Sequence, residues 1–148
     1  MTQNISSLDL KKRLEIAIPD SIIEARDDYL LVNTALLADI CQLLKEDKEL
    51  DLDYLSNLTA TDYKEYYEVI YRLVSLGKNH SITLKARLNK KKLTIPSVFH
   101  IWRGADLQER EVYDLMGITF SSHPNLKRIL LWEGFEGHPL RKDYSLDA

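Results

Sequence analysis

The sequence has one cysteine and no long hydrophobic run, and each shortage excludes a class of protein. With Cys41 alone, the chain cannot form an internal disulfide framework. It also cannot hold an iron–sulfur cluster by itself, because such a cluster normally takes four cysteine thiolates. Nowhere does the chain approach the ~18 consecutive apolar residues that a membrane-spanning helix needs. We therefore expect no redox cluster and no membrane span in this chain.

Short motifs for nucleotide binding are missing as well. The sequence contains neither G-x-G-x-x-G nor G-x-x-x-x-G-K-[ST], the glycine-rich loops that cradle phosphate groups. Residues 1–10 are polar and lack the apolar core of a secretory signal. We expect the chain to bind no cofactor of its own and to carry no secretory signal.

The composition suits one ordinary globular domain. The chain has 148 residues, a net charge of −3 and 45% hydrophobic residues, which is enough for a sizeable core. The basic run from Lys90 to Lys92 is typical of a solvated turn. An RNA-binding module built on these lysines is the alternative, and salt-dependent retention of RNA would favour it. Because the protein is acidic overall, we expect no nucleic-acid partner.

Hydrophobic periodicity predicts helices and strands in the first part of the chain. Residues 7–16 and 34–45 have apolar positions three and four apart, which is typical of amphipathic helices. Residues 21–25 and 29–32 are short and rich in Ile, Leu and Val, so we expect two strands around a turn.

Three strands and a long helix are predicted next. Residues 52–61 and 66–76 carry the strand-forming types Tyr, Ile, Val and Thr, and within 66–76 and 81–88 the apolar side chains occupy every second position, the period of a strand. Residues 98–116 predict a helix, with Gly104 in its interior marking a bend or the close approach of another backbone.

This order of elements predicts a two-layer α+β fold. We expect helices packed on one mainly antiparallel or mixed sheet, with an extended C-terminal tail. The α+β globular domain would cover residues 1–116, and the tail would cover residues 117–148.

The tail is rich in the residue types found at protein interfaces. Glycines and prolines interrupt it, yet it keeps apolar and aromatic residues that a disordered tail would lack. Trp132, Tyr144, Arg128 and Arg141 belong to the types enriched at binding hot spots. We predict that the tail docks on another protein; the alternative is that it wraps its own domain.

Four charges just before the tail are candidates for chemistry or for structure. Glu109 and Glu111 could form an acid–base pair, but residues two apart on a helix face different directions. Arg110 and Asp114 are four apart and can pair with each other. We favour an ion network that fixes the helix to the tail, in which basic residues of the tail supply opposite charges, namely Arg128, Arg141 and Lys142.

Two histidines, His123 and His138, each precede a proline. They could be metal ligands, but no third ligand follows at a recognisable spacing, so we expect no metal site. The interpretation we favour is that each ring N–H donates to a backbone carbonyl in a turn.

The segment from Glu109 to Tyr144 closely resembles the signature of the C-subunit family of NADH:quinone oxidoreductase, respiratory complex I. The family pattern has E-R-E, an acidic residue three positions later, two apolar residues, then histidine, a basic residue and two aliphatics. A second hallmark, G-x-P-L-R-K-D-Y, occurs as residues 137–144. The first motif is carried by Glu109, Arg110, Glu111, Asp114, Leu115, Met116, His123, Lys127, Ile129 and Leu130.

The resemblance implies a non-redox scaffold subunit in the peripheral arm of an enzyme that couples electron transfer from NADH to quinone with proton translocation. It implies that flavin and iron–sulfur clusters belong to partner subunits, and that the main partner is the large subunit that helps form the quinone site. The chain would lie at the cytoplasmic side of the cell membrane, or the matrix or stromal side in an organelle, and meet the membrane only through the complex. No residue is expected to be catalytic; the expected interface or structural residues are Glu109, Arg110, Glu111, Asp114, His123, Arg128, Trp132, Arg141, Lys142, Asp143 and Tyr144.

Two alternatives remain open at this point. The same scaffold role occurs in related membrane-bound hydrogenases, deazaflavin dehydrogenases and ferredoxin-dependent plastid-type complexes. A free-standing hydrolase or isomerase would use Glu109, Glu111 and His123, and activity of the purified chain would favour it. For the scaffold, we expect that replacing Arg141 impairs assembly and leaves the isolated domain's stability almost unchanged.

Overall fold

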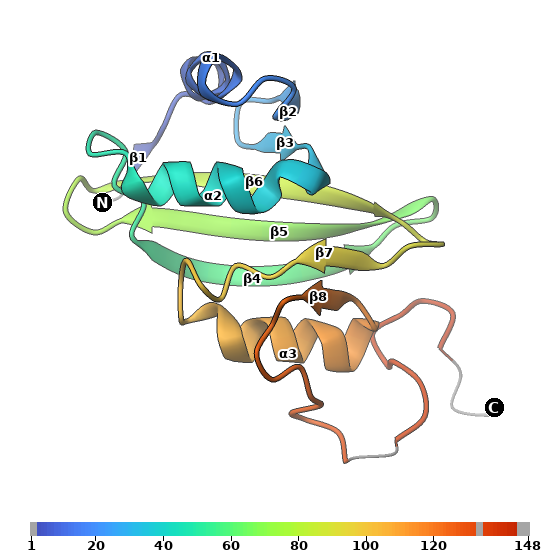
Figure 1. Ribbon diagram of the computed structural model, residues 1–148. Helices are drawn as coiled ribbons and strands as arrows, with labels where there is room; N and C mark the ends of the chain where they lie inside the picture. The colour runs from blue at the N-terminus through green and yellow to red at the C-terminus, as the bar shows by residue number, and fades with distance from the viewer. Residues whose placement is uncertain (1–2, 133–134, 145–148) are drawn as a thin grey trace.

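The computed structural model describes residues 3–132 and 135–144 (Figure 1). As predicted, the fold is α+β, with helices packed against one mainly antiparallel sheet. The elements of the first half are β1 (Gln3–Asn4), α1 (Ser7–Ala17), β2 (Ile22–Ala25), β3 (Leu30–Val32), the short 3₁₀ helix η1 (Thr34–Leu36) and α2 (Leu37–Glu46). The second half contains β4 (Tyr54–Asp62), β5 (Tyr66–Ser75), β6 (His80–Asn89), β7 (Thr94–Pro96), α3 (Ala105–Met116) and β8 (Thr119–Ser121).

The main sheet has the strand order β2-β3-β6-β5-β4, and β1 also pairs with β6. Strands β4, β5 and β6 form an antiparallel meander, because short turns join them in sequence. Strands β1 and β3 both run parallel to β6, so the sheet is mixed at that side.

Strand β5 and helix α2 build the centre of the core. On β5 the alternating residues Tyr67, Val69, Tyr71 and Leu73 are all buried, which confirms the predicted two-residue period. Helix α2 buries an apolar stripe that includes Ile40 and crosses the sheet in Figure 1. Each large aliphatic side chain buried in this way stabilises the fold by ~1.5–3 kcal/mol.

The opposite face of the central strands is polar. Glu68 on β5 is 1% exposed and lies 3.0 Å from Arg87 and 3.5 Å from Lys85, both on β6. Because side chains alternate along a strand, this ion cluster lies on the other side of the sheet from Tyr67 and Val69.

The helix predicted over residues 98–116 begins only at Ala105. Residues 98–104 form turns instead, in which the Trp102 N–H donates to the Val98 carbonyl at 2.9 Å. Val98 and Trp102 are buried, so their helix-like spacing reflects packing rather than helical backbone. Gly104 precedes the helix and does not bend it, which corrects the sequence-based expectation.

A small second sheet was not predicted. Strand β7 lies before α3 and pairs in parallel with β8, which follows it. Phe120 on β8 is 1% exposed and belongs to the core. Strand β8 is therefore part of the domain, and the rest of the tail follows it.

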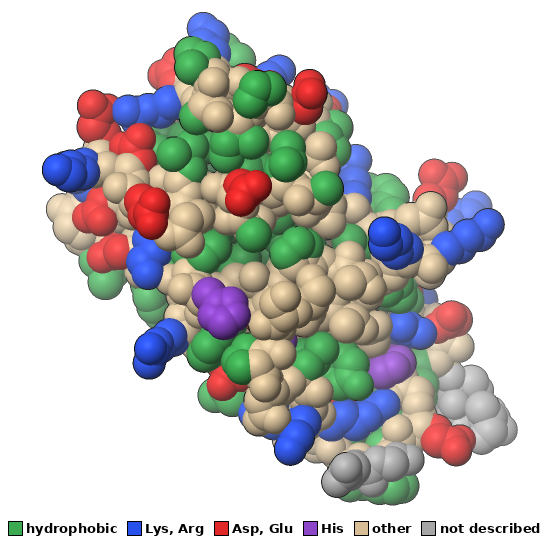
Figure 2. Space-filling model, viewed as in Figure 1, with side chains coloured by type: hydrophobic (Ala, Val, Ile, Leu, Met, Phe, Trp, Pro, Cys, Tyr) green, Lys and Arg blue, Asp and Glu red, His purple; other side chains and the backbone are tan. Residues whose placement is uncertain are grey.

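Between residues 122 and 144, the described part of the tail contains turns but no helix or strand. It runs beneath α3 in Figure 1. In Figure 2, charged side chains of both signs gather toward the margins of this face, while its middle is mostly apolar or uncharged. No helix within the described ranges has the length and apolar character to cross a membrane.

Candidate functional site

Asp114, in the last turn of α3, is the point at which the tail is fixed to the domain. Its side chain is fully buried and accepts a hydrogen bond from Arg128 Nη1 at 2.8 Å. The same carboxylate accepts the backbone N–H groups of Ile129, Leu130 and Leu131 at 3.1, 2.7 and 2.9 Å. The tail therefore bends around one carboxylate.

These donors keep Asp114 charged. Burial raises the pKa of its carboxyl, but the backbone donors and Arg128 outweigh burial and hold the pKa below its ordinary value. The sequence predicted that Asp114 holds the origin of the tail, and the contacts agree with that role.

Arg110 and Asp114, which their spacing allows to pair, form no salt bridge with each other. Arg110 instead donates to two carbonyls of the tail, those of Lys127 at 3.2 Å and Arg128 at 3.4 Å. Asp114 takes Arg128 as its partner, because a residue from the tail can reach its buried carboxylate. Arg110 still helps to hold the tail, through backbone acceptors rather than through a charge.

The C-terminal end of α3 is capped by side chains of the tail. Arg141 Nε donates to the Met116 carbonyl at 2.6 Å, and His138 Nδ1 lies 2.9 Å from the Asp114 carbonyl, as expected for its turn. The last carbonyls of a helix have no partner inside it and carry its negative dipole end, so a cationic donor there is stabilising. Gly117 makes this approach possible: its φ is 77°, and a Cβ at this position would overlap the Arg141 guanidinium.

The far end of the described tail returns to strand β4. The Lys142 N–H donates to Asp62 Oδ2 at 2.9 Å, and Lys90 Nζ lies 2.9 Å from Asp62 Oδ1. Lys142 thus contributes its backbone, while its side chain and that of Asp143 are exposed. Tyr144 is half-buried, with its ring against Gly137.

Several apolar side chains of the tail are exposed to solvent. Trp132 is 68% exposed and lies edge-on to Phe135, with ring centroids 5.9 Å apart. Leu130 and Leu140 are 61% and 59% exposed. We call Ile129, Leu130, Trp132 and Leu140 the apolar tail face.

Glu109 lies inside the domain and forms no salt bridge with Arg128, Arg141 or Lys142. It accepts hydrogen bonds from Ser97 Oγ at 2.5 Å and from the Val98 N–H at 2.9 Å. Burial raises the pKa of Glu109 to about 7, although these two bonds oppose the shift. Glu109 therefore joins α3 to the end of β7, a connection through Ser97 that the sequence did not indicate.

His123 also differs from its predicted bonding. Its Nδ1 accepts the Asn125 N–H at 3.0 Å, while Nε2 lies 3.0 Å from Asp106 and 3.9 Å from Glu109. Its side chain is fully buried, as is that of Glu109. The partner Asp106 carries no signal in the sequence beyond its place in the first turn of α3.

The structure gives no support to an acid–base site. Glu111 is exposed and lines a shallow pocket beside β4, whereas Glu109 and His123 are closed off from solvent. Lys91 and Lys92 are exposed on a turn after β6, as expected of a solvated run. Cys41 is buried, and burial raises the pKa of its thiol far above the ordinary range. Across residues 3–132 and 135–144, no group of three or more His, Cys, Asp or Glu side chains could hold a metal ion.

A two-layer α+β domain whose last helix is tied to a long C-terminal segment defines the structural class. Comparison with known proteins gives the family: residues 30–148 match the sequence model of the family described as "Respiratory-chain NADH dehydrogenase, 30 Kd subunit". The chain belongs to this family.

Two relatives with similar sequences align with most of the chain. It is 40% identical over 143 residues to the C-subunit of the NADH-quinone oxidoreductase of Roseiflexus castenholzii, covering 92% of this chain and 82% of the relative. It is 40% identical over 142 residues to the corresponding protein of Moorella thermoacetica, covering 95% and 88%.

Two solved structures share the fold. The trypsin-resistant fragment of Nqo5 superposes with a TM-score of 0.65 and 25% identity, covering 79% of this chain and 98% of the fragment. A chain of the membrane-bound sulfane sulfur reductase, an archaeal respiratory membrane complex, superposes with a TM-score of 0.75, covering 94% and 85%, at 22% identity. The second likeness concerns the fold alone.

Proposed function

We propose that this chain is a non-redox scaffold subunit of the peripheral arm of an NADH:quinone oxidoreductase. In that complex, electron transfer from NADH to quinone is coupled to proton translocation. The flavin and iron–sulfur clusters lie in partner subunits, and this chain takes no part in the chemistry. The relatives named as the C-subunit of this enzyme support the complex, and the burial of Glu109 and His123 supports the non-catalytic role.

The observation that carries this proposal is the apolar tail face, in which Asp114 holds the backbone of Ile129 and Leu130. Exposed tryptophan and leucine side chains lose contact with water when a partner covers them, and such burial is worth ~25 cal/mol per Å². A flexible segment would lose conformational entropy on docking. Here the Asp114 bonds already order residues 129–131, so less entropy remains to be lost.

The partner we propose is the large subunit that helps form the quinone site, with other peripheral-arm subunits beside it. Contact with the membrane is indirect, and the chain lies on the cytoplasmic side, or the matrix or stromal side in an organelle. The residues we assign to contacts with partners are Trp132, Lys142, Asp143 and Tyr144, with Arg128 and Arg141 positioning the tail. We keep residues 117–148 as the docking tail, although β8 also pairs with β7.

The test is the native mass of the chain extracted from its own membranes in mild detergent, with flavin and iron analysis of the same peak. We expect a peak of hundreds of kilodaltons that carries both cofactors and oxidises NADH. A cofactor-free peak near the monomer mass, under conditions where other respiratory complexes survive, would overturn the proposal.

Replacing Trp132 separates docking from folding. Because Trp132 is 68% exposed, Trp132→Ala should change the free energy of unfolding of the isolated chain by less than ~0.5 kcal/mol. The amount of chain in the large complex should fall at least about fivefold, since aromatic residues at interface centres often contribute more than ~1 kcal/mol. Native gel electrophoresis measures assembly, and urea unfolding measures stability.

Leu76→Ala is the matched control, because Leu76 is 67% exposed and lies on the turn after β5, away from the tail. Equal loss of assembly in both variants would remove the special role of the tail. Arg141 is a poorer probe than the sequence suggested, because its bond to the Met116 carbonyl gives it a role within the domain as well.

The same scaffold role in a related complex is the second candidate. The shared fold with a chain of an archaeal respiratory membrane complex favours keeping it open. The preferred electron donor of the purified complex distinguishes the two: NADH for the first, hydrogen, a deazaflavin or reduced ferredoxin for the second.

A further inference from the structure

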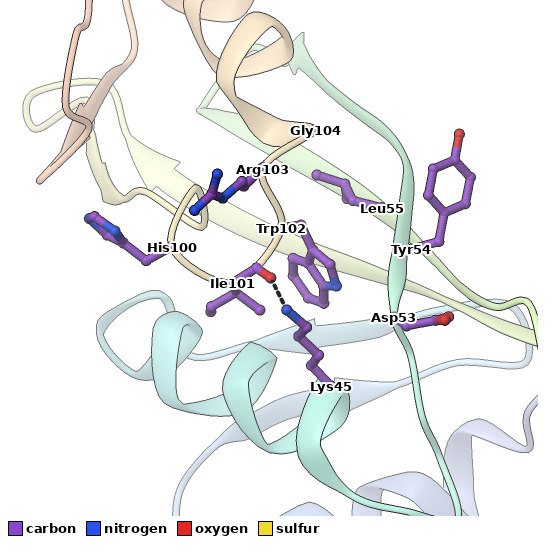
Figure 3. A pocket seen from close by; sticks show the side chains of 9 residues that line it. All are labelled: Lys45, Asp53, Tyr54, Leu55, His100, Ile101, Trp102, Arg103 and Gly104. Atoms are coloured by element: carbon purple, nitrogen blue, oxygen red, sulfur yellow. Dashed lines mark hydrogen bonds between the residues drawn. The ribbon is translucent and has the colours of Figure 1, made fainter.

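A pocket of about 330 Å³ lies at the end of α3 opposite the tail. It is bounded by the end of α2, the start of β4 and the loop that leads from β7 into α3 (Figure 3). Helix α3 has 12 residues, so at ~1.5 Å per residue its two ends are about 18 Å apart. The pocket is therefore distinct from the apolar tail face.

The floor of the pocket is apolar and fixed. Ile101, Trp102 and Leu55 line it and are 6%, 4% and 3% exposed. The Trp102 indole N–H donates to the Leu52 carbonyl at 3.0 Å, and Lys45 Nζ donates to the Ile101 carbonyl at 2.5 Å. Helix α2 and the chain before β4 thus hold the loop in place before any ligand arrives.

The rim of the pocket carries two basic side chains, Lys45 and Arg103, beside the imidazole of His100. Neither Lys45 nor Arg103 forms a salt bridge with a carboxylate among the described residues. Asp53 also lines the pocket, but its carboxylate accepts the Leu76 N–H at 3.1 Å. In Figure 3 the Asp53 side chain points away from Lys45.

Some basic groups elsewhere in the structure do form salt bridges: Arg87, Lys90 and Arg128 each have a carboxylate within 3.0 Å. Others, such as Arg110 and Arg141, donate to backbone carbonyls instead. The protein as a whole has a net charge of −3, so the basic rim is not a consequence of overall charge. On the face drawn in Figure 2, basic and histidine side chains lie around the loop before α3.

The start of α3 adds to this positive potential. Gly104 is its N-cap residue and provides no side-chain hydrogen bond to the first turn, where the helix dipole is positive. Asp106, the acidic residue of that turn, lies 3.0 Å from His123 Nε2, and its side chain is 38% exposed. Its charge is therefore directed at His123.

We propose that this pocket binds an acidic side chain, Asp or Glu, from a partner chain of the same complex. The carboxylate would meet Arg103 and Lys45 on the rim, and an apolar neighbour in the partner segment would pack over Trp102. A fixed apolar floor with a cationic rim matches such a segment better than a free ion, which would leave the floor uncovered. Because the partner belongs to the complex, the inference rests on the proposed function, and it adds a second contact point about 18 Å from the tail.

A photo-crosslinking amino acid identifies the occupant in the assembled complex. We would place p-benzoylphenylalanine at His100, which is exposed, isolate the large complex and sequence the cross-linked peptides. The expected result is one partner segment with an Asp or Glu within a few residues of the cross-link. Absence of any partner cross-link, or a segment without an acidic residue, would overturn the inference.

Charge reversal tests the chemistry of the contact. Arg103→Glu should lower the amount of chain in the complex about tenfold or more, because it sets like charges against each other in a desolvated contact. Lys91→Glu is the matched control, since Lys91 is exposed on a turn and lines no part of the pocket. Reversing the cross-linked acid to lysine should restore assembly of the Arg103→Glu variant. Equal assembly of both variants would overturn the inference.

The outcomes separate this inference from the proposed function. If the wild-type chain never migrates in a large complex, both fail. If it does so while the His100 probe finds no acidic partner segment, only the pocket assignment fails. Submillimolar binding of inorganic phosphate to the purified chain, lost in Arg103→Glu while assembly is unchanged, would make this a small-anion site and overturn the partner assignment.

Discussion

Helix α3 carries two fully buried carboxylates, Glu109 and Asp114, whose environments drive their pKa values in opposite directions. Glu109 meets two donors, Ser97 Oγ and the Val98 N–H, and its pKa is raised to about 7. Asp114 meets three backbone N–H groups and Arg128, and its pKa is lowered. At Glu109, burial and the nearby Asp106 charge outweigh two donors, whereas at Asp114 three backbone donors and Arg128 outweigh burial.

The difference corresponds to two kinds of attachment. Asp114 is a charged anchor for residues 122–144. Their described part has no helix or strand, so its backbone N–H groups depend on side-chain acceptors. Glu109 fastens the residues after β7, which the small sheet and the core already hold. The charged anchor supports the tail, and the acid with the raised pKa supports the domain.

Removing the charged anchor should have the largest effect. Asp114→Ala leaves Arg128 and three backbone N–H groups without their acceptor, and breaking a buried ion pair by removing one partner costs about 3–5 kcal/mol. Urea unfolding, followed by fluorescence of Trp102 and Trp132, measures the loss. Glu111→Ala is the exposed control on the same helix. A loss below ~1 kcal/mol in Asp114→Ala would contradict the anchoring role, since even one lost hydrogen bond costs about that much.

Making the second acid permanently neutral should remove a pH dependence. The folded pKa of Glu109 lies above the ordinary value of 4.5, at about 7, so its favourable contribution is complete below pH 4.5 and is lost as the pH rises toward 7. The size of that loss is on the order of 3 kcal/mol. Glu109→Gln keeps an oxygen acceptor for the Val98 N–H and cannot ionise.

The measurement is the free energy of unfolding between pH 4.5 and 8 for wild type, Glu109→Gln and Glu111→Gln. We expect the wild type and Glu111→Gln to lose stability with rising pH more steeply than Glu109→Gln. Asp114 has the opposite sign: its lowered pKa gives stability above its ordinary value of 3.8 that is lost on acidification. Parallel curves for all three proteins would refute the assignment of a raised pKa to Glu109.

A smaller effect is expected at the joint between helix and tail. Gly117→Ala places a Cβ where the Arg141 guanidinium lies and forces alanine to adopt a φ of 77°. Such a left-handed conformation costs about 1 kcal/mol for a residue other than glycine, and displacement of Arg141 adds to it. Gly104→Ala is the matched control, because nothing lies within 4 Å of a Cβ there and φ is −61°. Thermal unfolding should show a lower Tm for Gly117→Ala only; equal values would contradict the close approach of Arg141.

The sequence predicts the elements whose side chains follow a period. The alternating residues of β5 and the spaced leucines of α2 gave their type and place, because burial of one face leaves a repeating pattern. Strands β7 and β8 have three residues each and leave no period to detect. Val98 and Trp102 repeat like a helix because the loop before α3 packs them both into the core.

The candidate site residues also show what a local sequence pattern can predict and what it cannot. The motif contains Asp114, the expected ion network contains Arg128, and their bond is present at 2.8 Å. Helical spacing allowed Arg110 to pair with Asp114, because residues four apart are neighbours on a helix, whereas the folded tail supplies Asp114 with other donors. Contacts such as that of Glu109 with Ser97 depend on how two elements meet, which no local pattern records.

The bond from the Lys142 N–H to Asp62 bears on the order in which this chain folds. It joins residues 80 positions apart, so it encloses most of the meander, β7, α3 and β8 within one loop. Closing so long a loop costs entropy that local contacts do not, and contacts of this kind form late. The chain is also made from its N-terminus, so β4 is synthesised long before Lys142 exists. We therefore expect tail closure to come late in folding, and a chain broken off before residue 142 to keep its sheet but leave that loop open.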